Sequence, residues 1–230
     1  MTVRLGGKLI TDVRLGTKPI TQIRRGSQLI WSKATLRDDF NRADSIGLGA
    51  NWTDLGPATA PYLASVTNNY ARLNIPSNLV NLDLKTSRYR YTAGVKPNDN
   101  GHIETRVAIK GDAGWDRITE VYGWMNVDMS GGVAIRFDGS VASIVRRVNN
   151  TSVVVATGGT YAAGDILKLS RNGQTWTLRR NGQLAVEWVD DGNTVTTGAA
   201  FRSLGLLVTG TKDTLGPRRY SAAVDYIEAA

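Results

Sequence analysis

An alternation of apolar and polar residues between positions 166 and 188 limits most strongly how this chain can fold. The stretches Ile166–Arg171 (ILKLSR) and Thr175–Arg180 (TWTLRR) place apolar side chains at every second position, as half-buried antiparallel strands require. Asn172-Gly173 and Asn181-Gly182 separate the stretches, and Asn-Gly favours the two-residue turns of β-hairpins. This segment therefore predicts consecutive antiparallel strands joined by tight turns.

Strand-like segments continue through most of the chain, and no segment has the pattern of an amphipathic helix of ordinary length. Asp138-Gly139 is a third short turn signal. Many short strands with regular turn signals predict an all-β fold, an antiparallel β-sandwich of the jelly-roll type, over residues 38–230. The further expected strands are Tyr70–Ile75, His102–Lys110, Gly132–Phe137, Val141–Arg147, Ser152–Thr157, Leu184–Val189, Leu204–Val208 and Ala222–Ile227.

A ten-residue repeat opens the chain. Residues Val3–Ile10, Val13–Ile20 and Ile23–Ile30 share a β-branched residue, an arginine, a glycine and a closing isoleucine at equivalent positions. Each unit predicts a short strand, a glycine-centred turn and a second short strand. Three such hairpins bury too little apolar surface to be stable alone. Residues 1–31 are therefore predicted to form an attachment arm that needs a partner, followed by a linker at 32–37.

Positive charge is concentrated in this arm. The net charge is +8, and residues 1–37 hold eight basic residues against one acid, Asp12, which leaves the rest of the chain close to neutral. The repeat predicts that the arm docks onto another protein through strand pairing and its row of arginines. The alternative is that the arginines only keep an exposed edge soluble. The residues assigned to attachment are Arg4, Arg14, Arg24, Ile10, Ile20, Ile30 and Trp31.

Several motifs carry a family resemblance. The opening Asp38–Asp44 (DDFNRAD), the following Leu48–Trp52 (LGANW) and the paired strands of Gly164–Trp188 resemble the concanavalin A-like lectin/glucanase domains of actinobacteriophage minor tail proteins. Arg202–Thr209 and Val224–Glu228 are similar to the last strands of those domains. The repeat ending at Trp31 resembles the leader that precedes them. The motifs specify the fold better than the function, because this superfamily holds lectins, hydrolases and structural modules.

The resemblance implies a virion structural protein, assembled in the host cytoplasm, whose arm binds other tail or capsid proteins. Its outer domain would then bind carbohydrate of the host envelope. We expect a homo-oligomer, and specifically a trimer, because the arm alone leaves the backbone hydrogen-bonding groups at its strand edges without partners. One alternative is a capsid decoration protein or head fibre with a purely structural or adhesive role. The other is a glycoside hydrolase.

The hydrolase alternative is disfavoured by the distribution of acidic residues. Retaining hydrolysis needs two carboxyl groups about 5–5.5 Å apart, which on one strand means alternate residues. Glu104 is followed two positions later by Arg106, and Glu120 has no acidic neighbour. Asp190 and Asp191 are adjacent, so on a strand they would point to opposite faces. We therefore expect no enzymatic activity.

Other chemistries lack their residues. The chain has no cysteine and a single histidine, His102, so thiol chemistry is absent and a catalytic triad or zinc site would depend on one imidazole. No cofactor is expected. Calcium is possible, because Asp83, Asp99, Asp112 or Asp128 could supply oxygen ligands, but their spacing matches no known calcium loop and turn capping is the alternative. Neither a nucleic-acid-binding module nor a signal peptide or membrane span is recognisable.

Aromatic residues near turns are the candidates for sugar binding. Trp115 lies among turn residues beside Asp116, where the indole could stack on a sugar and the carboxylate could bind hydroxyls. Tyr122 and Trp124 follow on an alternating segment that predicts one shared side of a strand. The alternative is that these rings pack inside the protein, as is expected for Trp176 and Trp188.

Overall fold

The computed structural model describes residues 36–78, 80–112 and 117–230, together with the backbone of six short strands between residues 4 and 32. The chain divides into two compact units, Met1–Thr35 (with Ala230) and Leu36–Ala229. Strands are the main secondary structure, and the described helix is one 3-10 turn, η1 (Ala199–Phe201). Within the described residues, no helix has the length and apolar character needed to cross a membrane.

The first unit contains three two-stranded antiparallel hairpins, as the ten-residue repeat predicts. In each hairpin the repeated arginine occupies an equivalent register position, since Arg4 pairs with Leu9, Arg14 with Pro19 and Arg24 with Leu29. The strands are β1 (Arg4–Leu5), β2 (Lys8–Leu9), β3 (Val13–Leu15), β4 (Lys18–Ile20), β5 (Gln22–Arg25) and β6 (Gln28–Ser32).

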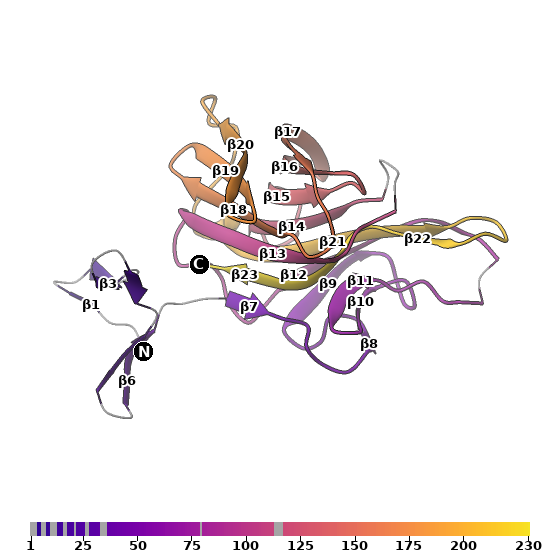
Figure 1. The fold of residues 1–230 in the computed structure, drawn as a ribbon, viewed down its shortest axis with the longest axis horizontal. Coiled ribbons are helices and arrows are strands. Elements are labelled where there is room, and N and C mark those ends of the chain that lie inside the picture. Colours follow the sequence, from indigo (N-terminus) through magenta and orange to yellow (C-terminus); the bar gives the residue numbers. More distant parts are fainter. Residues whose placement is uncertain are drawn as a thin grey trace. The chain divides into compact units, whose positions relative to one another are not determined.

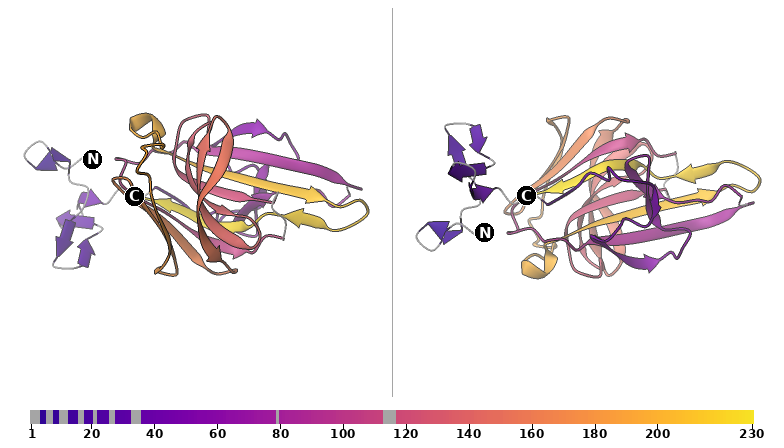
Figure 2. Two further views of the ribbon diagram at one scale, coloured as in Figure 1. Left: turned by 90° about the horizontal axis from the view of Figure 1, so that it is seen from above. Right: turned by 90° about the horizontal axis from the view of Figure 1, so that it is seen from below.

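The second unit is a sandwich of two antiparallel sheets, which Figure 1 shows from the side and Figure 2 from above and below. In the described chain the first sheet has nine strands in the order β20-β19-β18-β13-β23-β11-β10-β8, with β7 added to β23. Leu36 and Arg37, placed in the linker by the sequence, thus belong to a strand of the sandwich. Its members are β7 (Leu36–Asp38), β8 (Ser45–Ile46), β10 (Ala64–Thr67), β11 (Tyr70–Leu73), β13 (Gly101–Ile109), β18 (Ile166–Asn172), β19 (Thr175–Arg180), β20 (Gln183–Val189) and β23 (Ala223–Ala229).

The second sheet has eight strands among the described residues, in the order β17-β16-β15-β14-β21-β12-β9, with β22 added to β21. β14, the strand that carries Glu120, lies near its middle. The members are β9 (Trp52–Pro57), β12 (Leu82–Tyr91), β14 (Thr119–Met125), β15 (Gly132–Phe137), β16 (Val141–Val148), β17 (Thr151–Thr160), β21 (Ser203–Lys212) and β22 (Arg218–Tyr220).

The main hydrophobic core lies between the two sheets. It takes alternate side chains from both, for example Ile103 on β13 of the first sheet and Val121 on β14 of the second, each 0% exposed. Trp124 and Trp176 meet edge to face there, with ring centroids 4.8 Å apart. This packing confirms the predicted all-β sandwich and the expected burial of Trp176.

The turn signals act as predicted. Asn181 and Gly182 both have positive φ, as a two-residue hairpin turn requires, and they join β19 to β20. Gly173 and Gly139 also have positive φ between β18 and β19 and between β15 and β16. Asp138 completes the last of these turns, because its Oδ1 accepts a hydrogen bond from the Val141 amide at 2.8 Å.

Candidate functional site

The face of the eight-stranded sheet that points away from the main core carries a dense group of polar residues. We call it the outer face. Cross-strand register assigns its side chains, because paired residues share a face. Three central rows run across it. They are Thr157–Ser143–Arg136–Glu120–Leu207–Arg88, Val154–Val145–Ala134–Tyr122–Gly205–Arg90–Thr53 and Ser152–Arg147–Gly132–Met125–Ser203.

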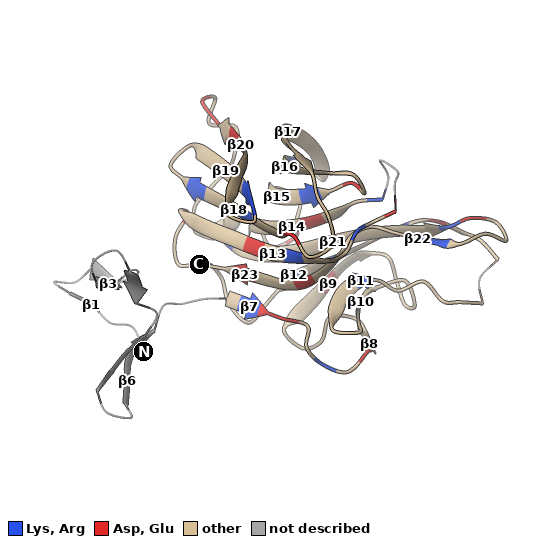
Figure 3. Cartoon of the chain, in the orientation of Figure 1, with Lys and Arg blue, Asp and Glu red and all other residues tan. Residues whose placement is uncertain are grey.

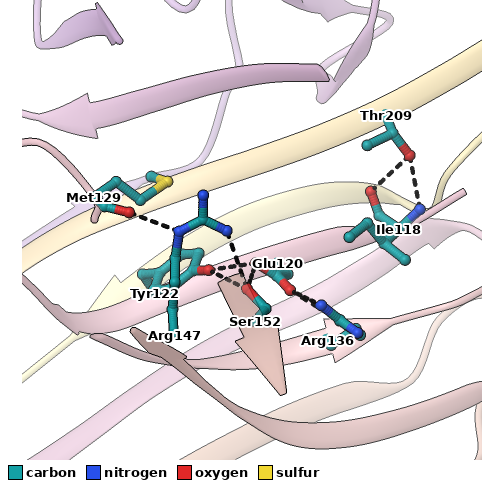
Figure 4. A network of polar contacts seen from close by, with 8 residues as sticks. All are labelled: Ile118, Glu120, Tyr122, Met129, Arg136, Arg147, Ser152 and Thr209. Atoms are coloured by element: carbon teal, nitrogen blue, oxygen red, sulfur yellow. Dashed lines mark hydrogen bonds and ion pairs between the residues drawn. The ribbon is translucent and has the colours of Figure 1, made fainter. Parts of the chain in front are cut away.

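Glu120 on β14 is the centre of a hydrogen-bond network drawn in Figure 4. Its Oε1 accepts two hydrogen bonds from Arg136 on β15, at 2.8 Å from Nε and 2.5 Å from Nη2. Its Oε2 accepts hydrogen bonds from the Tyr122 hydroxyl and, at 3.1 Å, from Ser152 Oγ on β17. Side chains from three strands of this sheet, β14, β15 and β17, therefore converge on one carboxylate.

This carboxylate is fully enclosed. The Glu120 side chain is 0% exposed and that of Arg136 is 17% exposed, so the ion pair is shielded from water. Burial raises the pKa of the Tyr122 hydroxyl well above its usual value, and the Glu120 carboxylate raises it further, so the phenol stays protonated and donates. A carboxylate with both oxygens satisfied and no exposed surface is suited to holding strands together.

A second, smaller apolar cluster fills the outer face beside Glu120. Tyr122, Met125 and Met129 are its largest members, and each is 0% exposed. Gly205 on β21 makes room for the methionines, since a Cβ at this position would lie 2.4 Å from Met125 Sδ and 2.6 Å from Met129 Cε. The loop that carries Met129 therefore covers this part of the sheet.

Two arginines form hydrogen bonds at the edge of this covered region. Arg147 donates from Nε to the Met129 carbonyl at 2.7 Å and from Nη1 to Ser152 Oγ at 3.1 Å. Arg88 donates from Nη1 to Asn150 Oδ1 at 3.0 Å. In a flat sheet with this strand order, β12 would lie about 19 Å from β16 and from the turn that carries Asn150. The contact requires that the sheet curve toward the outer face or that the turn bend over it.

The predicted sugar-binding aromatics do not form one platform. A bulge between Tyr122 and Trp124 shifts the register of β14 against β15, and the two rings lie in different clusters. The expectation of a shared side is therefore wrong. The cause lies at Gly123, where an added Cβ would lie 1.8 Å from Ile103 Cγ2. Tyr122 is enclosed on the outer face.

Trp124 instead lies in the main core, 1% exposed, and its Nε1 donates to the Asp99 carbonyl at 2.6 Å. In this structure neither Tyr122 nor Trp124 offers a free ring face to a ligand.

Trp115 and Asp116 lie outside the described residues, as does Ile10. For the other attachment residues the structure describes the backbone strands but not the side chains. These residues are Arg4, Arg14, Arg24, Ile20, Ile30 and Trp31.

The aspartates considered for calcium have other roles or none that the structure shows. Asp112 Oδ2 accepts a long-range hydrogen bond from the Tyr220 amide at 2.7 Å, whereas Asp128 Oδ1 caps its own turn by accepting one from the Ser130 amide at 2.9 Å. Asp99 pairs with Arg202 at 2.8 Å, and nothing in the structure gives a role to Asp83. Across the described residues, no cluster of three His, Cys, Asp or Glu side chains could hold a metal ion.

Solved structures of low sequence identity share this fold. The chain is similar to the carbohydrate-binding module CBM66 from Bacillus subtilis, with 15% identity and a TM-score of 0.50 over 76% of this chain and 91% of that one. It is also similar to a prokaryotic β-1,3-1,4-glucanase (lichenase) derived from a mouse hindgut metagenome, with 12% identity, a TM-score of 0.53 and coverage of 85% and 98%. The carbohydrate recognition domain of Emp47p gives 11% identity, a TM-score of 0.53 and coverage of 85% and 93%.

No protein-family model matches the sequence, and neither does any curated protein. At these identities the structural likeness shows the fold alone. The second unit is thus a jelly roll of the architecture found in carbohydrate-binding modules, lectin-like domains and glucanases, as predicted. A role in a phage particle stays a prediction.

Proposed function

We propose that the sandwich is a non-catalytic carbohydrate-binding domain that holds its ligand on the outer face of the eight-stranded sheet. The observation that carries the proposal is the state of Glu120, the sole carboxylate in the three central rows of the described sheet. It is buried, and both of its oxygens are occupied by protein donors. Hydrolysis by two carboxylates needs a second acid within about 5–9.5 Å and access for water.

The surroundings of Glu120 supply hydrogen-bonding groups that suit sugar hydroxyls. Thr53 and Asn150 are exposed, Ser152 is half-buried, and the guanidinium of Arg136 remains partly accessible. Strands hold Thr53, Ser152 and Arg136 in place, and the hydrogen bond from Arg88 holds Asn150 on its turn, which limits the entropy lost when a ligand binds. This is the pattern of a binding surface with fixed polar groups.

Labelling can test the location of binding, because the chain has no native cysteine. Thr53→Cys places a thiol on the outer face, and Leu184→Cys places one on β20 of the other sheet, where Leu184 is 57% exposed. A bulky maleimide on Thr53→Cys should abolish retention of the full chain in gels that contain a bound polysaccharide. The same label on Leu184→Cys should leave retention unchanged. Equal retention of both labelled proteins would contradict the proposed location.

Catalysis is tested separately by the release of new reducing ends from each polysaccharide that binds. We expect none above a heat-treated control. If product appears and Glu120→Gln abolishes it while retention persists, the domain is an enzyme and the non-catalytic part of the proposal is wrong.

We further propose that residues 1–31 attach the domain to a larger assembly, a phage particle, as a minor tail protein whose sandwich contacts host-surface glycans. Support comes from the three hairpins, each with its arginine in the same register position, and from the +7 charge of residues 1–37. The expected partners are tail or capsid proteins and further copies of this chain. Deletion of residues 1–31 should remove the protein from purified particles while the sandwich keeps its β-sheet circular dichroism. A truncated protein that still attaches would refute the arm's role.

A further inference from the structure

The two sheets of the sandwich carry different patterns of charge on their exposed faces. On the nine-stranded sheet, one row runs Arg37–Glu228–Glu104–Lys168–Arg179. Both acids of this row are paired, Glu228 with Arg37 at 2.7 Å and Glu104 with Lys168 at 3.4 Å. Figure 3 shows the mixed charges along β13 and β7. This face is close to electrically balanced.

The outer face of the eight-stranded sheet is not balanced. Its three central rows hold Arg88, Arg90, Arg136 and Arg147 against the single acid Glu120. Figure 3 shows the acid on β14 beside the basic residue on β15. That acid is already paired with Arg136. Within the described residues, no carboxylate lies within ion-pairing distance of the other three arginines.

These three arginines are also partly shielded from water. Arg147 is 8% exposed, and Arg88 and Arg90 are half-buried. The Arg90 Nε atom is buried and has no hydrogen-bond partner. Burial lowers the pKa of Arg88 and the nearby charge of Arg147 lowers it further, while the carboxylates of Asp128 and Asp54 oppose this shift only in part. Like charges held together at partial burial cost free energy unless an anion compensates them.

We propose that the Arg88–Arg90–Arg147 group binds an anionic glycan through the carboxylate or sulfate groups of that glycan. This inference rests on the proposed carbohydrate-binding function and names its class of ligand. Guanidinium groups bind carboxylate and sulfate oxygens through paired, charge-assisted hydrogen bonds. Arg88 and Arg90 are alternate residues on one face of β12, so their backbones lie about 7 Å apart and present two cations in line. The exposed Thr53 and Asn150 flank them for neutral hydroxyls.

A glycan fits this face better than a nucleic acid. Binding of single strands depends on exposed aromatic rings on which bases stack, and the ring in these three rows, Tyr122, is 0% exposed. The basic residues that do lie here are few and recessed, in contrast with the extended basic stripe typical of duplex binding. Binding of DNA is therefore a result that would count against the proposal.

The test uses the full chain and four probes, polygalacturonate, dextran sulfate, neutral dextran and a short DNA duplex. Arg90→Gln is the main variant, because no hydrogen bond is lost with its side chain and folding should be preserved. Arg88→Gln is the second. The matched control is Arg179→Gln on the other sheet, an exposed arginine that likewise has no carboxylate partner. The basic arm is the same in all of these proteins, so its contribution cancels.

We expect polygalacturonate or dextran sulfate to bind more tightly than dextran, and the preferred polymer identifies carboxylate or sulfate as the ligand group. Arg90→Gln should weaken that binding about five- to tenfold, the loss of one charge-assisted hydrogen bond, while Arg179→Gln stays within about twofold.

Unchanged affinity in both Arg90→Gln and Arg88→Gln, with circular dichroism intact, would overturn the inference. The inference would also be overturned if the protein binds DNA and the same substitutions weaken that binding as much as they weaken glycan binding. If neutral dextran binds and resists these substitutions, carbohydrate binding stands and only the anionic specificity fails. If no glycan binds, the proposed function itself fails.

Discussion

Lys96 should make the stability of the sandwich rise with pH. The residue is 1% exposed, its Nζ lies 3.4 Å from the centroid of the Trp124 ring, and Nζ has no hydrogen-bond partner. Burial, helped by the charges of Arg171 and Arg202 and opposed by that of Asp99, lowers the pKa of Lys96 to about 6. The folded protein therefore holds a neutral amine at pH 7.

The sign of the effect follows from the two pKa values. The folded-state pKa of about 6 lies below the model-peptide value of 10.5, so between these pH values the unfolded chain binds one more proton. The free energy of unfolding then rises with pH across this window, by about 1.4 kcal/mol for each pH unit. From pH 7 to pH 9 the gain is about 2.7 kcal/mol, which for a domain of this size raises Tm by about 5–10 °C.

Lys96→Met removes the titrating group and keeps an unbranched chain against Trp124. Thermal melts followed by circular dichroism at pH 7 and pH 9, at constant ionic strength, give the change in Tm for the parent and the variant. We expect the variant to lose most of the pH-dependent gain and to be more stable than the parent at pH 7. Lys110→Met, at an exposed lysine, is the control and should behave as the parent does. Equal pH dependence in parent and Lys96→Met would refute the reasoning and show that Lys96 stays charged over the indole ring.

Three further predictions concern buried positions. Gly123→Ala should lower the free energy of unfolding by about 1–3 kcal/mol in urea titrations, because the new methyl would overlap Ile103; an unchanged midpoint would mean that the bulge can move. Glu120→Ala should cost about 3–5 kcal/mol by leaving Arg136 unpaired, whereas Glu104→Ala on the more exposed face should cost less than about 1 kcal/mol; similar costs would contradict the difference in burial. Burial alone would raise the pKa of Asp38, but hydrogen bonds from Arg42 and Trp52 outweigh it and hold the pKa below 3.8. The stability that Asp38 contributes is present above pH 3.8 and is lost as pH falls through its folded-state value, so Asp38→Asn should flatten the acid limb of a pH–stability curve.

The local parts of the fold were accessible from sequence. β18 and β19 follow from period-two alternation, and the turn at Asn181-Gly182 follows from the need for positive φ. Such signals lie within a few residues of each other. Leu82–Tyr91 (β12) escapes the same reasoning because Lys85, Thr86 and Ser87 interrupt its alternation, although its last residues, Arg88 to Tyr91, alternate cleanly.

The candidate site could not be predicted, because it depends on register between distant segments. Glu120 has no acidic neighbour in the sequence, and its partners Arg136 and Ser152 come from two other strands. Alternation also failed to assign the sides of Tyr122 and Trp124, since one bulge at Gly123 reverses every later side chain of β14. A glycine between two aromatic residues is the signal that points to such a bulge.

The position of Tyr122 bears on whether two carboxylates could act together on this face. Tyr122 stands two residues after Glu120 on the same face of β14, which is the nearest position on that strand for a second carboxylate. Here that position holds a phenol whose hydroxyl is bonded to Glu120 and whose ring lies beneath the loop of Met129. A carboxylate placed there would meet Glu120 in a site closed to water, where two like charges cannot both ionise. Hydrolysis at this position would therefore need the loop removed as well as the acid added, and this is the reason for the binding role proposed for the outer face.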